Sequence, residues 1–435
     1  MSKTDHLKWL YKELPDLVSK GILSDESVAK LKGHYGEIDE KPAYDIALLL
    51  AAILGAVLIG GGIILLFAHN WDQFSRPVRT LLSFAPLVVA QILYGYVFFK
   101  KKDHTAWVEA SSAFLMLMLA ACIALISQTY HIQGKMEDFL FIWMLLSVPL
   151  LYLMNATLPA LFYLYGIMSW VMNVPDEMAF GYWLFFMGAL PHLVKNMYLD
   201  KSVVRSRLLG WTLAFSFPPA LIRIIDFDIN MITILAIGIL ISVFYLLGER
   251  IYSTKESLIY KPFQTVSVCI AFVLLMFLGY EWPKVRGNMG SAINPNMIAF
   301  VIVALIAMGT YCWLTYQDWK SKRRINYFII LLPIILLVGQ LLADGGAKTV
   351  AIVLANVYLF GFGIYYIKYG IENFRISLVN LGMFFISALI VARFFDTDWG
   401  FVVKGLVFIF LGIGFLWINV VLSKRLKARA KVLQS

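Results

Sequence analysis

Charged residues are scarce in this 435-residue chain: they make up 15% of it, whereas soluble globular domains carry about 25%. Hydrophobic residues make up 60%, and the mean hydropathy is +0.77. A water-soluble core could not bury this much apolar surface, so lipid must surround most of the chain. The composition excludes a soluble globular protein and indicates a multi-pass membrane protein.

Cysteine and the common catalytic motifs are also scarce. The three cysteines, Cys122, Cys269 and Cys312, all lie inside apolar runs and form no Cys-x-x-Cys or Cys/His spacing. This pattern argues against a disulfide framework and a zinc site. The sequence has no His-Glu-x-x-His, Gly-x-Ser-x-Gly or Walker motif, which weakens the case for a metalloprotease or a primary pump. We therefore expect no metal and no cofactor, and an enzyme is the less favoured class.

Fourteen apolar runs follow a polar N-terminal segment, each close to the roughly 20 residues of a spanning helix. They lie at 46–68, 80–99, 108–128, 138–154, 157–173, 179–194, 207–224, 230–248, 263–280, 297–316, 326–343, 348–367, 376–393 and 399–422. The runs between 138 and 194 are short, so the count there is open by one helix pair. The predicted fold is all-α: a hairpin (1–43), a transmembrane bundle of about 14 helices (44–423) and a basic tail (424–435).

The basic residues predict how the bundle is oriented. With the N-terminus in the cytoplasm, the inner segments hold 28 Lys and Arg residues and the outer loops hold 8, with Lys404 inside the last run. Basic residues concentrate on the cytoplasmic side of membrane proteins, so both ends are predicted to be cytoplasmic. The basic residues behind the net charge of +10 recur in short loops between apolar runs and do not form one face. We therefore expect no nucleic acid partner.

The N-terminal segment predicts two short helices. Leu7, Leu10, Leu14 and Leu17 form a helical apolar stripe, although Pro15 should kink it. Gly21 is typical of a helix end. Ser24, followed by two acidic residues, is typical of the start of a second helix that ends near Gly33.

Polar residues of mixed chemistry gather at the predicted outer ends. The inner side carries mostly Lys and Arg, which topology alone explains, whereas the outer ends combine acids, bases, amides and imidazoles. A shared outer cavity and a set of helix caps and interfacial anchors are both compatible with this pattern. The candidate binding residues are His69, Asn70, Gln128, Tyr130, His131, Arg393, Asp396 and Lys404.

The spacing of Arg393 and Asp396, three residues apart, places them on one helical face. A buried arginine needs such a partner, so a structural ion pair and a substrate-binding pair are equally compatible with the sequence.

Several segments resemble the bacterial predicted membrane proteins grouped as domain of unknown function 2157 (DUF2157). They are LVSKGILSDESVAKLKGHYG, the AHNWD that ends the first apolar run, ALISQTYHIQG and VNLGMFFISALIVARFFDTDWG. Ser127 stands where glycine is usual in the third segment. The resemblance implies a membrane protein and implies little about activity, because the family is defined by its unknown function.

Three functions are consistent with these features. The favoured hypothesis is a bacterial inner-membrane protein that binds or moves a small or amphipathic substrate through an outer cavity. In it, Arg393 would hold an anionic group and Asp396 or His131 would exchange a proton. The alternatives are an enzyme on a lipid or lipid-linked substrate with His131 as general base, and a structural or signalling protein that recruits a partner through its hairpin. The lipid bilayer is an expected partner in each case, and the oligomeric state is not assigned.

Overall fold

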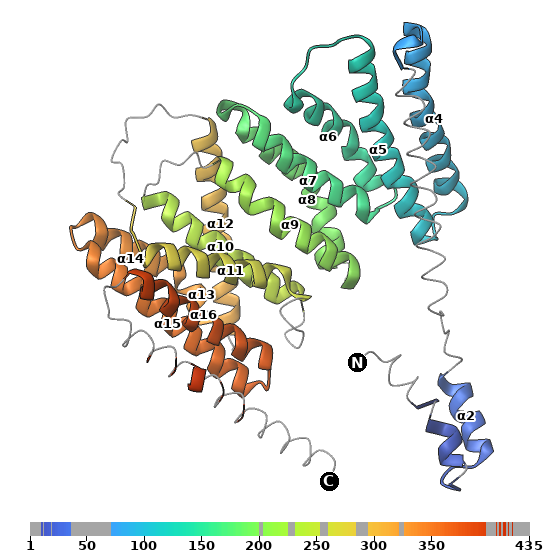
Figure 1. The fold of residues 1–435 in the computed structure, drawn as a ribbon. Helices are drawn as coiled ribbons and strands as arrows, with labels where there is room; N and C mark the ends of the chain where they lie inside the picture. Colours follow the sequence, from blue (N-terminus) through green and yellow to red (C-terminus); the bar gives the residue numbers. More distant parts are fainter. Residues whose placement is uncertain are drawn as a thin grey trace. The chain divides into compact units, whose positions relative to one another are not determined.

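The computed structural model describes residues 10–35 apart from 12 and 19, then 71–199, 203–224, 231–252, 260–283, 295–321 and 326–396, and isolated residues between 406 and 420. Within these ranges all regular structure is helical and no strand occurs (Figure 1). The prediction of an all-α fold is therefore confirmed.

Each apolar run from the second to the thirteenth corresponds to helix. The longer α-helices are α4 (Arg76–Lys100), α5 (Thr105–Thr129), α6 (Met136–Leu153), α7 (Thr157–Asn173), α8 (Tyr182–Val194), α9 (Val203–Ile224), α10 (Met231–Ile251), α11 (Pro262–Leu278), α12 (Pro295–Lys320), α14 (Leu332–Asp344), α15 (Lys348–Glu372) and α16 (Ile376–Asp396). Short 3-10 helices η1 (Trp71–Gln73) and η2 (Asp176–Gly181) and a π-helix, η3 (Lys195–Leu199), lie between them.

The first and last runs lie largely outside the described residues. Run 46–68 is entirely outside them, and of run 399–422 only isolated residues such as Leu406 and Ile409 are described, as helix. Among the described helices, seven are long and apolar enough to cross a membrane: α4, α5, α6, α10, α12, α15 and α16. The chain is thus a multi-pass helical membrane protein, while the count of fourteen stays a prediction.

Run 326–343 differs from the expected single helix. It is divided into α13 (Tyr327–Ile330) and α14, with Leu331 between them. Pro333 lies in the first turn of α14, where its missing N–H group costs no helical hydrogen bond. The proline therefore starts a new helix at a position that hydropathy cannot distinguish from helix interior.

The chain divides into two compact units, Met1–Arg79 and Thr80–Ser435. In the first unit, residues 10, 11 and 13–18 are helical and α2 (Asp25–Tyr35) follows. Gly21 has a φ of +70° between them, and the Ser24 side chain accepts a hydrogen bond from the Ser27 N–H. Leu14 of the predicted apolar stripe is buried. The domain boundaries at 43 and 423 stay predictions.

Two hydrophobic cores organise the second unit. The first core gathers buried side chains mainly from α5 to α9, with Met116, Tyr163 and Leu209 among them. The second core gathers side chains from α10, α11 and α13 to α16, with Leu336 and Phe362 among them. Helices α10 and α11 contribute to both cores and so form the seam between them.

Large apolar side chains also cover the outside of the long helices. Only 17% of the membrane-length window of α12 is buried, and Leu305 on this helix is 67% exposed. Exposed apolar area of this extent needs a hydrocarbon solvent. The lipid bilayer is therefore a partner of the chain.

Helices α15 and α16 form an extensively packed antiparallel pair (Figure 1). Gly382 on α16 faces Gly363 on α15, and a Cβ atom at Gly382 would collide with the Gly363 carbonyl oxygen and lie 2.8 Å from the Ile367 nitrogen. Both of these neighbours are backbone atoms, which cannot rotate away. Small residues allow such close contacts in lipid, where the hydrophobic effect does not drive helices together.

We expect Gly382→Ala to lower the free energy of unfolding by about 1–3 kcal/mol, the usual cost of overpacking a close contact. Gly309→Ala on α12 is the matched control, because a Cβ atom there meets nothing within 4 Å. Thermal unfolding of the two variants in the same detergent measures the difference. Equal melting temperatures for both variants would contradict the proposed backbone contact.

Candidate functional site

Helix α7 begins without a side-chain cap of its own. Its N-cap residue is Ala156, and Asn155 before it has a φ of +51°, which turns the chain sharply into the helix. The first N–H groups of a helix have no acceptor within the helix. The Glu109 carboxylate of α5 accepts hydrogen bonds from the Thr157 N–H at 2.8 Å and from the Leu158 N–H at 2.7 Å. A carboxylate from α5 thus caps α7, where the helix dipole favours negative charge.

Arg205 of α9 connects this cap to η3. Its Nε donates to Thr157 Oγ1 at 2.9 Å, and its Nη1 donates to Asn196 Oδ1 at 3.0 Å. Its Nη2 lies 3.7 Å from a Glu109 carboxylate oxygen, which completes an ion pair between partly buried side chains. One guanidinium group therefore joins α5, α7, η3 and α9.

Two asparagines and a histidine extend the network. Asn155 and Asn196 exchange amide hydrogen bonds of 3.1 and 2.7 Å, and Asn196 Nδ2 also donates to the His192 carbonyl at 2.9 Å. Asn196 and His192 are buried. We call Glu109, Asn155, Thr157, His192, Asn196 and Arg205 the Glu109–Arg205 network. Its hydrogen bonds connect helix ends, so its first role is to hold α7, α9 and η3 together.

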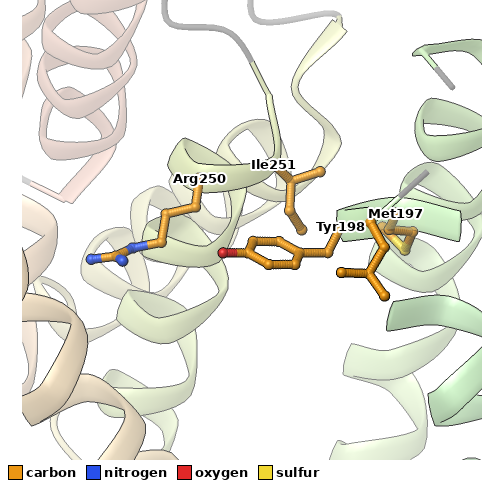
Figure 2. Close-up of a pocket in the computed structure, with 5 residues that line it drawn as sticks. Met197, Tyr198, Arg250 and Ile251 are labelled. Carbon is orange, nitrogen blue, oxygen red and sulfur yellow. The ribbon is translucent and has the colours of Figure 1, made fainter. Parts of the chain in front are cut away.

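A cavity of about 310 Å³ lies beside η3. Met197, Tyr198 and Leu199 line it from η3, and Arg250 and Ile251 line it from the end of α10 (Figure 2). π-Helical turns are rare in proteins, and many of those that occur lie at functional sites. Met197 is buried in the first core and Ile251 packs against it, so the cavity lies at the edge of the first core, next to the end of α10, a helix that contributes to both cores.

Arg250 is held by α12. Its Nη2 donates to Asp318 Oδ1 at 2.9 Å and to the Leu314 carbonyl at 3.1 Å, and its Nη1 donates to Gln317 Oε1. The guanidinium carbon lies 5.5 Å from the centre of the Trp313 ring. The Asp318 carboxylate is buried, and its pairing with Arg250 offsets the cost of burying both charges.

Polar contacts between helices connect ends that the charge pattern predicts to be on the same side. The predicted cytoplasmic contacts include Glu109 with Arg205, Arg250 with Asp318, and Asn326 with Tyr245 and Tyr366. The predicted outer contacts include Arg223 with Asp176, Thr80 with Tyr130, and Arg393 with Asn356. This agreement supports the alternation of helix directions.

The outer-site residues predicted from the sequence are only partly described. His69, Asn70, Lys404 and the Asp396 side chain lie outside the described residues. Gln128, Tyr130 and His131 lie at the end of α5, and Arg393 lies near the end of α16. Tyr130 contacts Thr80 of α4, whereas Arg393 contacts α11 and α15. Their convergence in one cavity stays a prediction.

The SQTYHIQG stretch forms a helix C-terminal cap. The Ile132 N–H donates to the Ser127 carbonyl at 2.9 Å, and the His131 N–H donates to the Gln128 carbonyl at 3.3 Å. His131 has a φ of +49°. Together these features define a Schellman motif, in which the position of His131 is usually glycine. The motif explains how α5 ends and why the imidazole of His131 is exposed.

Arg393 has a comparable structural role at the end of α11. Its Nη2 donates to the Met276 carbonyl at 3.1 Å, and its Nε donates to Asn356 Oδ1 at 2.8 Å. Asn356 Nδ2 in turn donates to the Gly279 carbonyl at 2.9 Å. The last carbonyl groups of a helix lack partners, and positive charge is favourable beside them. These contacts favour a structural role for Arg393.

The sequence analysis did not select the inner residues Asn196, Arg205, Arg250 and Asp318. Their basic members were explained by topology alone. The available signal was the presence of acids among the inner bases, since Glu109 and Asp318 serve no purpose for membrane orientation. Ala156 gave a second signal, because a helix that starts with alanine needs a cap from elsewhere.

A family model described as "Predicted membrane protein (DUF2157)" matches residues 15–160. The match extends from the hairpin to the first turn of α7, and so includes SQTYHIQG, Glu109 and Thr157. The resemblance inferred from the N-terminal segments is confirmed over this range, while VNLGMFFISALIVARFFDTDWG lies beyond it. Searches of curated proteins and of solved structures found no match.

We expect Glu109→Gln and Arg205→Gln each to lower the free energy of unfolding by about 3–5 kcal/mol, because each leaves a partly buried charge without its partner. The double variant should lose less than the sum of the two. A double-mutant cycle from unfolding in detergent measures this coupling. The exposed pair Glu26 and Lys30 is the control, and its two substitutions should be additive. Additive effects at Glu109 and Arg205 would show that the ion pair does not stabilise the fold.

Proposed function

We propose that this protein transports a small or amphipathic substrate across a bacterial inner membrane, and that the cavity beside η3 is the cytoplasmic part of its route. The supporting observation is that the cavity lies against the first core at the end of α10, a helix that contributes to both hydrophobic cores. Transporters alternate access by moving one helix group against another around a binding site. Two cores that meet at a seam are suited to such a movement, because each core can move as a body.

The lining of the cavity matches an amphipathic substrate. Met197, Leu199 and Ile251 provide apolar surface, whereas Tyr198 and Arg250 provide polar groups. A volume of about 310 Å³ is at the lower end for ligand sites, which span roughly 300–1,000 Å³. It suits a small molecule or the polar end of a larger one. In this proposal the outer residues Gln128, Tyr130, His131 and Arg393, with His69, Asn70, Asp396 and Lys404, belong to the outer part of the route.

The test is transport in liposomes with the cavity filled. Ile251→Trp adds bulk to the cavity lining, whereas Leu305→Trp on the exposed face of α12 adds the same side chain away from it. The probe is a fluorescent short-chain phosphatidylglycerol whose movement between leaflets is followed by chemical quenching. We expect the wild type and Leu305→Trp to move the probe at similar rates, and Ile251→Trp to be at least tenfold slower.

A parallel arm uses an encapsulated small organic anion, so that transport of a soluble substrate is also detected. Equal rates for Ile251→Trp and Leu305→Trp would contradict the assignment of the route to this cavity. Rates equal to those of protein-free liposomes in both arms would contradict transport itself.

A further inference from the structure

Arg250 has two roles in the structure: it lines the cavity and it binds α12. Figure 2 shows its guanidinium group extending away from Tyr198, whose hydroxyl points toward the Arg250 side chain. The guanidinium end bonds to Gln317, Asp318 and the Leu314 carbonyl, all on α12. A movement of this one side chain would therefore change both the cavity and the contact between α10 and α12.

The hydrogen bonds of Arg250 are incomplete on its Nε atom. Both Nη atoms donate to α12, whereas Nε is buried and has no hydrogen-bond partner among the described residues. A buried donor without a partner loses its water without a replacement, and Arg250 Nε shares this state with other buried donors such as Trp282 Nε1. Because Arg250 Nε has almost no accessible surface, an anion can accept its hydrogen bond only after the side chain turns toward the cavity.

The charges around the cavity favour an anion over a cation. Among the described residues that line the cavity, Arg250 is the charged one, and its partner Asp318 lies on α12 and outside this set. A planar guanidinium group binds phosphate and carboxylate groups with two parallel hydrogen bonds. A ligand that offers these oxygens can compete directly with Asp318 for the same donors.

The apolar part of the lining specifies the rest of the ligand. Met197, Leu199 and Ile251 can contact a hydrocarbon segment next to the anionic group. The cavity is partly open, and its volume of about 310 Å³ can accommodate a head group and not a whole lipid. Hydrocarbon beyond the head group would extend into the bilayer that surrounds the helices.

We propose that the cavity binds the phosphate head group of an anionic amphipathic lipid through Arg250, and that binding moves Arg250 from Asp318 to the ligand. This inference rests on the proposed transport function and names its substrate class. The exchange weakens the contact between α10 and the cytoplasmic end of α12. Helix α12 packs mainly on α10 and η2, so loss of the Arg250 contact frees that end to move.

Equilibrium binding to the purified full-length chain in neutral phosphatidylcholine nanodiscs tests this inference. The probes are short-chain phosphatidic acid, short-chain phosphatidylcholine and inorganic phosphate, each titrated by calorimetry. We expect phosphatidic acid to bind at least tenfold more tightly than the other two. Phosphatidylcholine that binds as tightly would overturn the requirement for an anion, and inorganic phosphate that binds as tightly would overturn the assignment to an amphipathic lipid.

Two substitutions of opposite effect make the test specific. Arg250→Gln should weaken phosphatidic acid binding at least tenfold, whereas Asp318→Asn should tighten it several-fold, because it removes the competitor and retains the guanidinium group. Arg223→Gln is the control, since Arg223 pairs with Asp176 at the opposite predicted end. If Arg250→Gln does not fold, Arg250→Lys and Asp318→Asn still decide. Unchanged or weaker binding by Asp318→Asn would overturn the exchange.

The outcome separates this inference from the proposed function. Lipid binding with the expected charge dependence but no transport in liposomes would support the site and contradict transport. Transport that is insensitive to both Arg250 and Asp318 substitutions would support transport and overturn the anionic substrate.

Discussion

The structure depends on the requirement that polar groups in hydrocarbon find their hydrogen-bond partners within the protein. Helix ends are the most demanding places, because each leaves several backbone groups without a partner in the helix. Here neighbouring helices supply what is missing. Glu109 of α5 caps the start of α7, and Arg393 of α16 binds a carbonyl group at the end of α11. Charged side chains therefore fix helix ends against one another at both predicted sides of the membrane.

The end of α10, a helix that contributes to both cores, differs from the rest. Within each core the helices are joined by close apolar packing. At this end, Arg250 is bound to α12 on one side and lines a cavity on the other. The polar group that connects helices here is also placed to meet a ligand, which is why we assign function to this region and stability to the Glu109–Arg205 network.

The sequence predicted the helices well, because a long apolar run in lipid must satisfy its backbone polar groups internally, as an α-helix does. The second to thirteenth apolar runs correspond to helices with ends within a few residues of those expected, and the helix end at Gly21 was predicted from the glycine alone. The break at Leu331 was not predicted, since hydropathy is the same on both sides of Pro333. His131 at a glycine-like position was not predicted either, because its side chain suggests chemistry while its backbone forms a cap.

The candidate site was harder to predict than the fold. The outer residues were selected for their varied chemistry, and two of those described, His131 and Arg393, have contacts that explain them structurally. The inner residues were missed because arginine at a cytoplasmic helix end is expected in any membrane protein. Only the three-dimensional contacts separate an arginine that serves topology from Arg250, which joins two helices beside a cavity.

The most direct measurement is the side from which the cavity can be reached. Tyr198→Cys, in a chain whose three native cysteines are replaced by serine, places a thiol in the lining at a position that is 55% exposed. A membrane-impermeant maleimide should label this thiol in inside-out vesicles and leave it unlabelled in right-side-out vesicles. Labelling in right-side-out vesicles alone would show that the cavity faces the periplasm, and would contradict both the predicted orientation and the cytoplasmic site.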